Sequence, residues 1–194
     1  MSFLKKLLNI PVKEDKEIQK QEVILSLDDL FVHNFVEKGG RFLYCSTKSE
    51  VTDNLKNILI ENSWNRISLL NKNLATFFSE KDADISGNFN SEIPVFINCE
   101  YLIADNGDIL FTSNQLKSNK LSEMPLNFIV YATTSQLVND MGEGLTGINT
   151  HHRDNLPTNI SAIKNYAINK NEDNLLNYRN SNSKNLYLLL LEDL

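Results

Sequence analysis

Cysteine is scarce in this chain of 194 residues, which contains only Cys45 and Cys99. The two do not form a C-x-x-C pair, and no Cys/His pairs accompany them, so a zinc site or a disulfide framework has little support. Both lie in strand-like runs, where an unpaired cysteine usually acts as a small apolar side chain. We therefore expect neither a metal site nor a cofactor held by this chain.

Basic clusters and long apolar runs are also lacking. The formal net charge is −6, and an acidic chain without a basic cluster repels a phosphate backbone, so nucleic acid is not an expected partner. No run approaches the roughly 18 apolar residues of a membrane span. Lys5 and Lys6 interrupt the apolar start, which is too short for a signal peptide. We expect a cytoplasmic protein without a membrane span.

The first half of the chain alternates between helical and strand patterns. Apolar residues recur at helical spacing from Leu27 to Phe35, and Gly39-Gly40 favours the end of that helix. The elements expected next are a strand over 41–45, a helix over 47–62, a strand over 66–70, a short helix over 74–78 and a loop over 82–92. This order predicts right-handed crossovers and a largely parallel sheet. Residues 1–25 are expected to be a lead-in or first helix, and residues 26–194 a single α/β domain.

Two β-rich runs, 95–104 and 108–113, meet at Asn106-Gly107. Asn-Gly between such runs predicts a β-hairpin with a type I′ turn, since both turn residues then need a positive φ. In that register Ile103 faces Leu110. Both faces are apolar near the turn, so burial on both sides is expected.

The second half is predicted to contain further strands and one helix. The expected elements are a strand over 127–132, a helix over 135–141, a loop over 142–158, a strand over 159–163 and a last strand over 186–191. Gly142 to Gly147 fits the G-x-G-x-x-G pattern, but a dinucleotide site needs a strand before it and a helix after it, and neither is predicted here. His151-His152 is expected in a solvated loop, because adjacent residues do not face one another as metal ligands.

Closely spaced carboxylates surround the predicted turn. Asp105 and Asp108 are expected opposite each other, where like charges repel unless water, a cation or a basic side chain intervenes. A solvated turn is one interpretation, and a polar site at the hairpin tip is the functional alternative. The sequence assigns no catalytic residue and no metal ligand. The candidate ligand-binding residues are Glu100, Asp105, Asn106, Gly107, Asp108, Lys164 and Asn165.

The middle of the chain also carries a recognisable order of motifs. They are Ala104-Asp-Asn-Gly-Asp108, the apolar strand 109–113, Met124-Pro125, the strand 128–132 and Ser135-Gln-Leu-Val138. This order resembles the LUD domain family (lactate utilisation, LutC/YkgG-like), which has an A-D-T-G-T-like segment, a leucine-proline element and an S-Q-I-V-type helix at the corresponding places. Asn106 and Asp108 stand where the family has threonines, so this chain would be a divergent member.

The resemblance implies both a fold and a role. The family fold is a three-layer α/β/α sandwich, NagB/RpiA/CoA-transferase-like, with a parallel-rich sheet between helices. LutC-like members serve in a complex that oxidises L-lactate to pyruvate, and partner subunits carry the iron–sulfur clusters. Two cysteines are too few for a cluster. We therefore expect an accessory or ligand-binding component with a degenerate site rather than a self-sufficient enzyme, with iron–sulfur subunits as partners and a small anionic ligand as a candidate.

Two alternatives stay open. The first is a small-molecule enzyme of the sugar-phosphate isomerase/CoA-transferase type that uses the carboxylates near Asp105 and Asp108. The second is a non-catalytic interaction scaffold. A concave pocket where the hairpin turn lies beside Lys164 and Asn165 would favour a ligand site, and a filled surface there would favour the scaffold.

Overall fold

The computed structural model describes residues 25–78, 83–86, 93–117, 119–166 and 182–193. The expected lead-in over residues 1–25 therefore lies outside the described residues, apart from Leu25.

A six-stranded sheet forms the centre of the structure, and its strand pairs are all parallel. Its order across the sheet is β1 (Arg41–Cys45), β10 (Asn185–Leu191), β7 (Asn127–Thr133), β4 (Val95–Asn98), β2 (Arg66–Leu69) and β3 (Asp84–Ser86). The last strand of the chain lies between β1 and β7, which explains why it is almost continuously apolar: a central parallel strand is covered on both faces. The expected α/β class with a largely parallel sheet is confirmed, while β3 occupies part of a segment that was expected to be loop.

Side-chain alternation along the strands divides the core into two clusters. On one face, Ile129 and Leu189 pack with α3 (Lys48–Glu61) and η1 (Lys72–Phe77). On the other face, the neighbouring residues Val130 and Leu188 pack with α2 (Leu27–Glu37) and with a second sheet. This period of two is what a strand buried on both sides requires.

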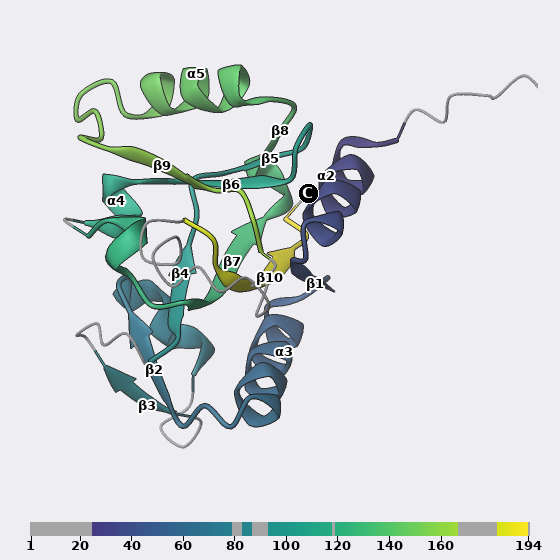
Figure 1. Cartoon of the computed structure of the whole chain (residues 1–194), viewed down its shortest axis with the longest axis vertical. Helices are drawn as coiled ribbons and strands as arrows, with labels where there is room; N and C mark the ends of the chain where they lie inside the picture. Colours follow the sequence, from purple (N-terminus) through teal and green to yellow (C-terminus); the bar gives the residue numbers. More distant parts are fainter. Residues whose placement is uncertain (1–24, 79–82, 87–92, 118, 167–181, 194) are drawn as a thin grey trace, which may run out of the picture.

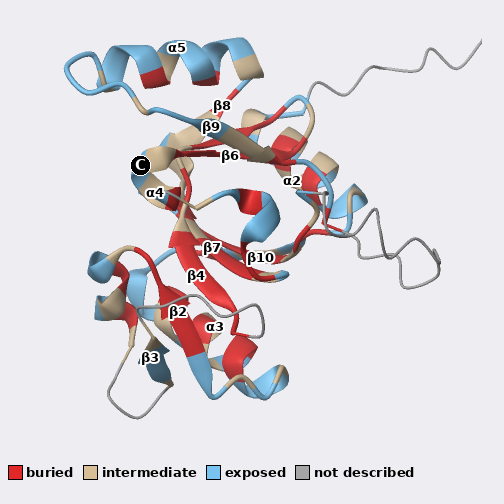
Figure 2. Ribbon diagram, turned by 60° about the vertical axis from the view of Figure 1, so that its left-hand side comes forward, coloured by how far each residue is buried: buried red, intermediate tan, exposed pale blue. Residues whose placement is uncertain are grey.

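The second sheet has four strands in the order β8 (Leu137–Val138), β5 (Tyr101–Ile103), β6 (Asp108–Thr112) and β9 (Ile160–Ile163). Leu102 and Ile109 point to the large sheet, whereas Ile103 and Leu110 pack with Ile148 of α5 (Met141–His151). The small sheet thus lies between the large sheet and α5 (Figures 1 and 2). Two short helices, α4 (Ser113–Leu116) and η2 (Leu121–Glu123), connect β6 to β7.

The small sheet was not predicted, because the run 95–104 was expected to be one strand. The chain instead leaves the large sheet after Asn98 and enters the small sheet at Tyr101. Both halves of the run are equally buried, so their hydrophobicity does not reveal the break between them.

The predicted hairpin is present, but its predicted register is wrong. β5 and β6 are antiparallel, with Ile103 opposite Asp108 rather than opposite Leu110. Of the two central turn residues only Gly107 has a positive φ, 68°, so the turn is not type I′. The side chain of Asn106 instead accepts a hydrogen bond from the N–H of Asp108 at 3.1 Å, which closes the turn locally.

The expected helix over 135–141 is also wrong, and the expected loop over 142–158 is wrong up to His151, while residues 152–158 are irregular as expected. A 3₁₀ turn, η3 (Thr134–Gln136), leads into β8, and α5 begins only at Met141. Asp140 caps this helix by accepting a hydrogen bond from the N–H of Glu143 at 2.9 Å. The glycines that hid the helix allow it to approach the small sheet, since a Cβ at Gly147 would collide with the hydroxyl of Tyr101.

Within the described residues, no helix is long and apolar enough to cross a membrane. The helix α3, with 14 residues, is shorter than the roughly 20 that a span needs.

Candidate functional site

The tip of the β5–β6 hairpin is packed against helix α2. The side-chain N–H₂ of Asn34 donates to the carbonyls of Ala104 at 2.8 Å and Asp105 at 3.1 Å. A Cβ on Gly107 would lie 2.5 Å from the backbone nitrogen of Phe35. The turn is therefore a filled contact between a hairpin and a helix.

Asp108 is buried rather than solvated, with 1% of its surface exposed. Its carboxylate forms an ion pair with the ammonium of Lys38, which follows α2, at 2.9 Å. Asp105 is exposed, so the expected opposition of Asp105 and Asp108 across the turn is wrong. The basic side chain that such a carboxylate requires comes from Lys38.

Lys164 and Asn165 directly follow β9, which pairs with β6, and both are exposed. The residue that reaches the turn is their neighbour Tyr166, whose hydroxyl donates to the carbonyl of Gly107 at 2.6 Å. Burial raises the pKa of this phenol well above its usual range. Asp105, Gly107 and Asp108 thus belong to a packed turn, and Asn106 closes that turn from within.

Glu100 lies at the opposite end of the hairpin, where the chain crosses from the large sheet to the small sheet. Its backbone N–H donates to the carbonyl of Leu110 at 2.8 Å. The side-chain amide of Gln136 donates to the carbonyls of Cys99 at 2.7 Å and Glu100 at 3.0 Å. The crossing is therefore fixed by η3, and the direction of the Glu100 side chain is fixed with it.

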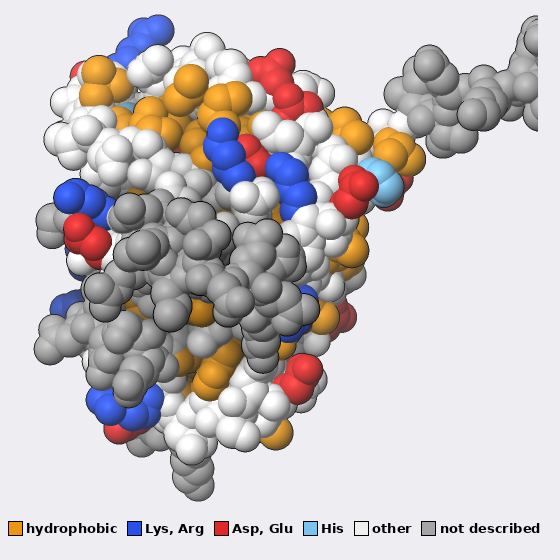
Figure 3. Space-filling model, viewed as in Figure 1, with side chains coloured by type: hydrophobic (Ala, Val, Ile, Leu, Met, Phe, Trp, Pro, Cys, Tyr) orange, Lys and Arg blue, Asp and Glu red, His pale blue; other side chains and the backbone are white. Residues whose placement is uncertain are grey.

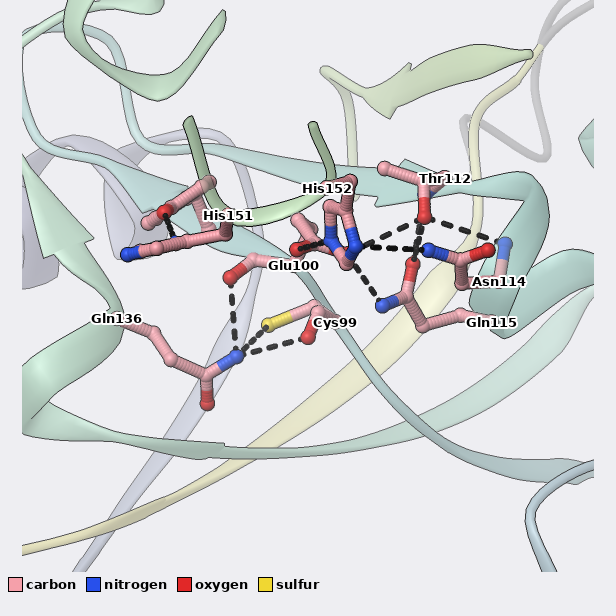
Figure 4. A network of polar contacts seen from close by, with 9 residues as sticks. Cys99, Glu100, Thr112, Asn114, Gln115, Gln136, His151 and His152 are labelled. Carbon is pink, nitrogen blue, oxygen red and sulfur yellow. Dashed lines mark hydrogen bonds and ion pairs between the residues drawn. The ribbon is translucent and has the colours of Figure 1, made fainter. Parts of the chain in front are cut away.

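The carboxylate of Glu100 is the centre of a polar network (Figure 4). Oε2 accepts hydrogen bonds from the hydroxyl of Thr112 at 3.2 Å and from the amide of Gln115 at 2.5 Å. Oε1 lies 2.8 Å from Nε2 of His152. The Glu100 side chain is 11% exposed and the His152 side chain 27% exposed, so the network reaches solvent through the imidazole.

The two adjacent histidines at the end of α5 point to different partners. Nδ1 of His151 lies 2.8 Å from the hydroxyl of Tyr101, while His152 contacts Glu100 through Nε2 and the amide nitrogen of Asn114, at 3.4 Å, through Nδ1. Burial raises the pKa of Tyr101. The pair was expected in a solvated loop, but it is the last residue and the cap of a helix.

The hydrogen-bond partners assign the roles of the His152 nitrogens. A carboxylate only accepts hydrogen bonds, so Nε2 carries a proton directed at Oε1. In the neutral ring, Nδ1 then holds the lone pair and accepts from Asn114. A carboxylate that orients an imidazole in this way supports hydrogen-bond acceptance or general-base chemistry at the second ring nitrogen.

The sequence analysis identified Glu100 but missed the residues that contact its carboxylate. Thr112 and Gln115 form a capping box at the start of α4, and the T-x-x-Q spacing at the end of an apolar run was an available signal. His152 was missed because the three glycines concealed α5.

The described part of the chain contains no ready set of ligands for a metal ion or an iron–sulfur cluster. No group of three or more His, Cys, Asp or Glu side chains there can hold a metal ion. Cys45 and Cys99 are both buried and belong to core clusters on opposite faces of the large sheet. Burial also raises the pKa of the Cys99 thiol far above its usual range.

The surface charge of the face in Figure 3 is mixed. Lys and Arg side chains of the described residues are interspersed with Asp and Glu rather than gathered into one basic stripe. This face therefore lacks the electrostatic pattern that a phosphate backbone needs.

No model of a known protein family matches the chain, and no curated protein matches it in sequence. The fold is similar to the crystal structure of a DUF162 family protein from Deinococcus radiodurans, with a TM-score of 0.62 and 14% sequence identity. The similarity covers 87% of this chain and 99% of that chain. It therefore concerns the whole architecture rather than a shared motif.

Proposed function

We propose that this chain is a divergent LUD-like protein that acts in the cytoplasm as an accessory component of lactate utilisation, the oxidation of L-lactate to pyruvate. The observation that carries the proposal is the likeness in fold to nearly the full length of a DUF162 family protein, a family related to the LUD domain. The motif order from Ala104 to Val138 supports the same relationship.

The position of the two cysteines supports an accessory role rather than a self-sufficient one. Oxidation of the lactate hydroxyl to a ketone releases two electrons and two protons, which an acceptor must take up. A cluster with thiolate ligands needs several cysteines around one point, whereas Cys45 and Cys99 are buried on opposite faces of the large sheet. Under this proposal, a partner subunit carries the iron–sulfur acceptor.

The test is affinity capture of the tagged full-length chain from its source cells, grown on L-lactate or on another carbon source. We expect an iron–sulfur protein to co-purify from lactate-grown cells, identified by mass spectrometry and by the iron and acid-labile sulfide in the eluate. An unrelated tagged protein of similar charge is the control. The accessory role is wrong if the chain is abundant in lactate-grown cells and no iron–sulfur protein accompanies it.

The structure bears differently on the two alternatives. An enzyme using Asp105 and Asp108 is disfavoured, because Asp108 is buried in an ion pair with Lys38. The packed turn favours an interaction scaffold. A thermal-shift screen with sugar phosphates, CoA esters and L-lactate separates them: a ligand that binds the folded state raises the Tm, and a pure scaffold shows no shift with any of them.

A further inference from the structure

Strand β1 forms one edge of the large sheet. It pairs with β10 on one side, and among the described residues no strand lies on its other side. Figure 1 shows it at the margin of the molecule, between α2 and α3. It has five residues, whereas the other described edge strands have three (β3), two (β8) and four (β9). An open edge of this kind is a template for pairing with another strand.

The backbone groups of β1 face two directions. In a parallel pair, alternate residues direct both their N–H and their C=O group to the same neighbouring strand. The carbonyl of Cys45 accepts a hydrogen bond from the N–H of Glu192, which follows β10, at 2.9 Å. Cys45 and every second residue before it therefore face β10. Phe42 and Tyr44 direct their N–H and C=O groups outward, where no other described segment bonds to them.

The side chains at this edge are largely apolar and only partly covered. Phe42 is partly buried against the core cluster beside α2, and Leu43 is partly buried against the cluster beside α3. Tyr44 is 46% exposed. Edge strands are commonly protected from pairing by lysine or proline. Pro157 and Lys164 flank β9 in this way, but β1 contains neither residue type.

We propose that β1 pairs antiparallel with β1 of a second copy of this chain, so that the two large sheets become one. With Leu43 on the two-fold axis, Phe42 of each copy lies opposite Tyr44 of the other copy. These pairs use every outward N–H and C=O group of the two residues. Each pair also places one aromatic side chain beside another. The surface is thus self-complementary, as a closed two-fold dimer requires.

The charges at the two ends of β1 fit this antiparallel arrangement. Arg41 is exposed at the amino end. At the carboxyl end, Glu50 accepts a hydrogen bond from the N–H of the residue after β1, and Glu192 bonds to the last carbonyl of the strand. Both glutamates are exposed, and Lys48 beside them offsets only one of the two charges. Antiparallel pairing brings the Arg41 of each copy to the acidic end of the other, whereas parallel pairing would place like ends together.

The experiment is sedimentation velocity of the full-length chain over a wide range of concentration. We expect a monomer–dimer equilibrium. Tyr44→Lys places a cation against Phe42 of the second copy and should weaken association about tenfold or more. Tyr44→Pro should do the same, because it removes an outward N–H but no bond to β10. Ile160→Lys makes the matched change in the edge strand β9 and should associate as the unmodified chain does.

Two cysteine variants test the register. Leu43→Cys should form a disulfide-linked dimer under mild oxidation, because position 43 lies opposite itself across the axis. Phe42→Cys lies on the other face of the sheet and away from its own copy, so it should form this link far more slowly. The two native cysteines are buried.

Circular dichroism of each variant checks that the fold is intact. If Tyr44→Pro does not fold, Tyr44→Lys decides, since it keeps every backbone group. The proposal is overturned by a monomer at every concentration, or by association that Tyr44→Lys leaves unchanged. Equal weakening by Ile160→Lys, or equal cross-linking of the two cysteine variants, overturns it as well.

Discussion

Each end of the β5–β6 hairpin carries a carboxylate, but the two carboxylates have different partners. At the turn, Asp108 is 1% exposed and is neutralised by the ammonium of Lys38. At the other end, Glu100 is held by a hydroxyl and an amide, and it meets an imidazole that reaches solvent.

The difference separates a structural contact from an adaptable one. The Lys38–Asp108 ion pair, 2.9 Å long, joins the end of helix α2 to the hairpin turn. An imidazole can donate or accept at each ring nitrogen, so the Glu100–His152 pair tolerates a change of partner. We expect changes at the turn to destabilise the fold more than changes at the other end.

The largest effect is expected from Gly107→Ala. Gly107 has a φ of 68°. A Cβ added at this position would also lie 2.5 Å from the backbone nitrogen of Phe35 in α2. Left-handed backbone strain costs roughly 1–2 kcal/mol for alanine, and the overpacking adds about 1–3 kcal/mol. Urea unfolding followed by circular dichroism should show a loss of about 3 kcal/mol.

Gly39→Ala is the matched control for that prediction. Gly39 also has a positive φ, 90°, but it lies at the exposed end of α2. It should show the backbone strain alone, about 1 kcal/mol. Equal losses in the two variants would contradict the view that the turn is packed against α2.

Lys38→Met comes next and tests the ion pair directly. Its removal leaves the buried carboxyl group of Asp108, 1% exposed, without its cationic partner, with an expected loss of about 2 kcal/mol. Asp108→Asn should cost less, about 1 kcal/mol, because the Lys38 side chain is 31% exposed and can turn to solvent. The double variant should be more stable than Lys38→Met alone, as measured by the free energy of unfolding. Additive losses would mean that the two side chains do not interact.

Prediction from the sequence succeeded where the spacing of apolar residues agreed with the residues that mark the ends of helices and strands. The helix from Leu27, the strand 41–45 and the final strand each appear where they were expected, since their apolar residues face a single core or lie at its centre. The break at Cys99–Glu100 was not recognised in this way, because the polar residues Asn98 and Glu100 alternate with apolar ones, a period of two that a single half-buried strand also shows.

The candidate site was predictable only in part, for a related reason. Asn106-Gly107 is a strong local signal, and it points to the turn and its carboxylates. The partner of Glu100 lies 52 residues away, and its position depends on how closely α5 packs against Tyr101. Long-range packing of that kind leaves no pattern within a short window of sequence.

Lys184 is a buried amino group that, among the described residues, contacts a backbone carbonyl and an aromatic ring rather than a carboxylate or an imidazole. It is 2% exposed, donates to the carbonyl of Met124 at 3.0 Å and lies over the ring of Phe128. Burial lowers its pKa to about 8. Below pH 8 the ammonium is charged in both states and the burial cost is fully present.

Between pH 8 and the ordinary lysine value, the unfolded chain binds the extra proton, so the stability contribution of Lys184 rises with pH. Lys184→Met removes the buried charge but leaves the Met124 carbonyl without its donor. The net gain at pH 7 should be about 1 kcal/mol. The difference in unfolding free energy between variant and unmodified chain should shrink from pH 8 to pH 10. A difference that stays constant would show that the ammonium is not desolvated.

The smallest effect on stability is expected from Glu100→Gln, which tests whether the two ends of the hairpin differ. Glutamine keeps the shape of the side chain and one acceptor oxygen for Thr112 and Gln115. Its N–H₂ then faces His152, whose ring must present a lone pair at Nε2 and move its proton to Nδ1. Unfolding should change by less than about 1 kcal/mol, while ¹⁵N spectra should show the opposite His152 tautomer. A loss of stability as large as that of Lys38→Met would mean that both ends of the hairpin serve only to hold it in place.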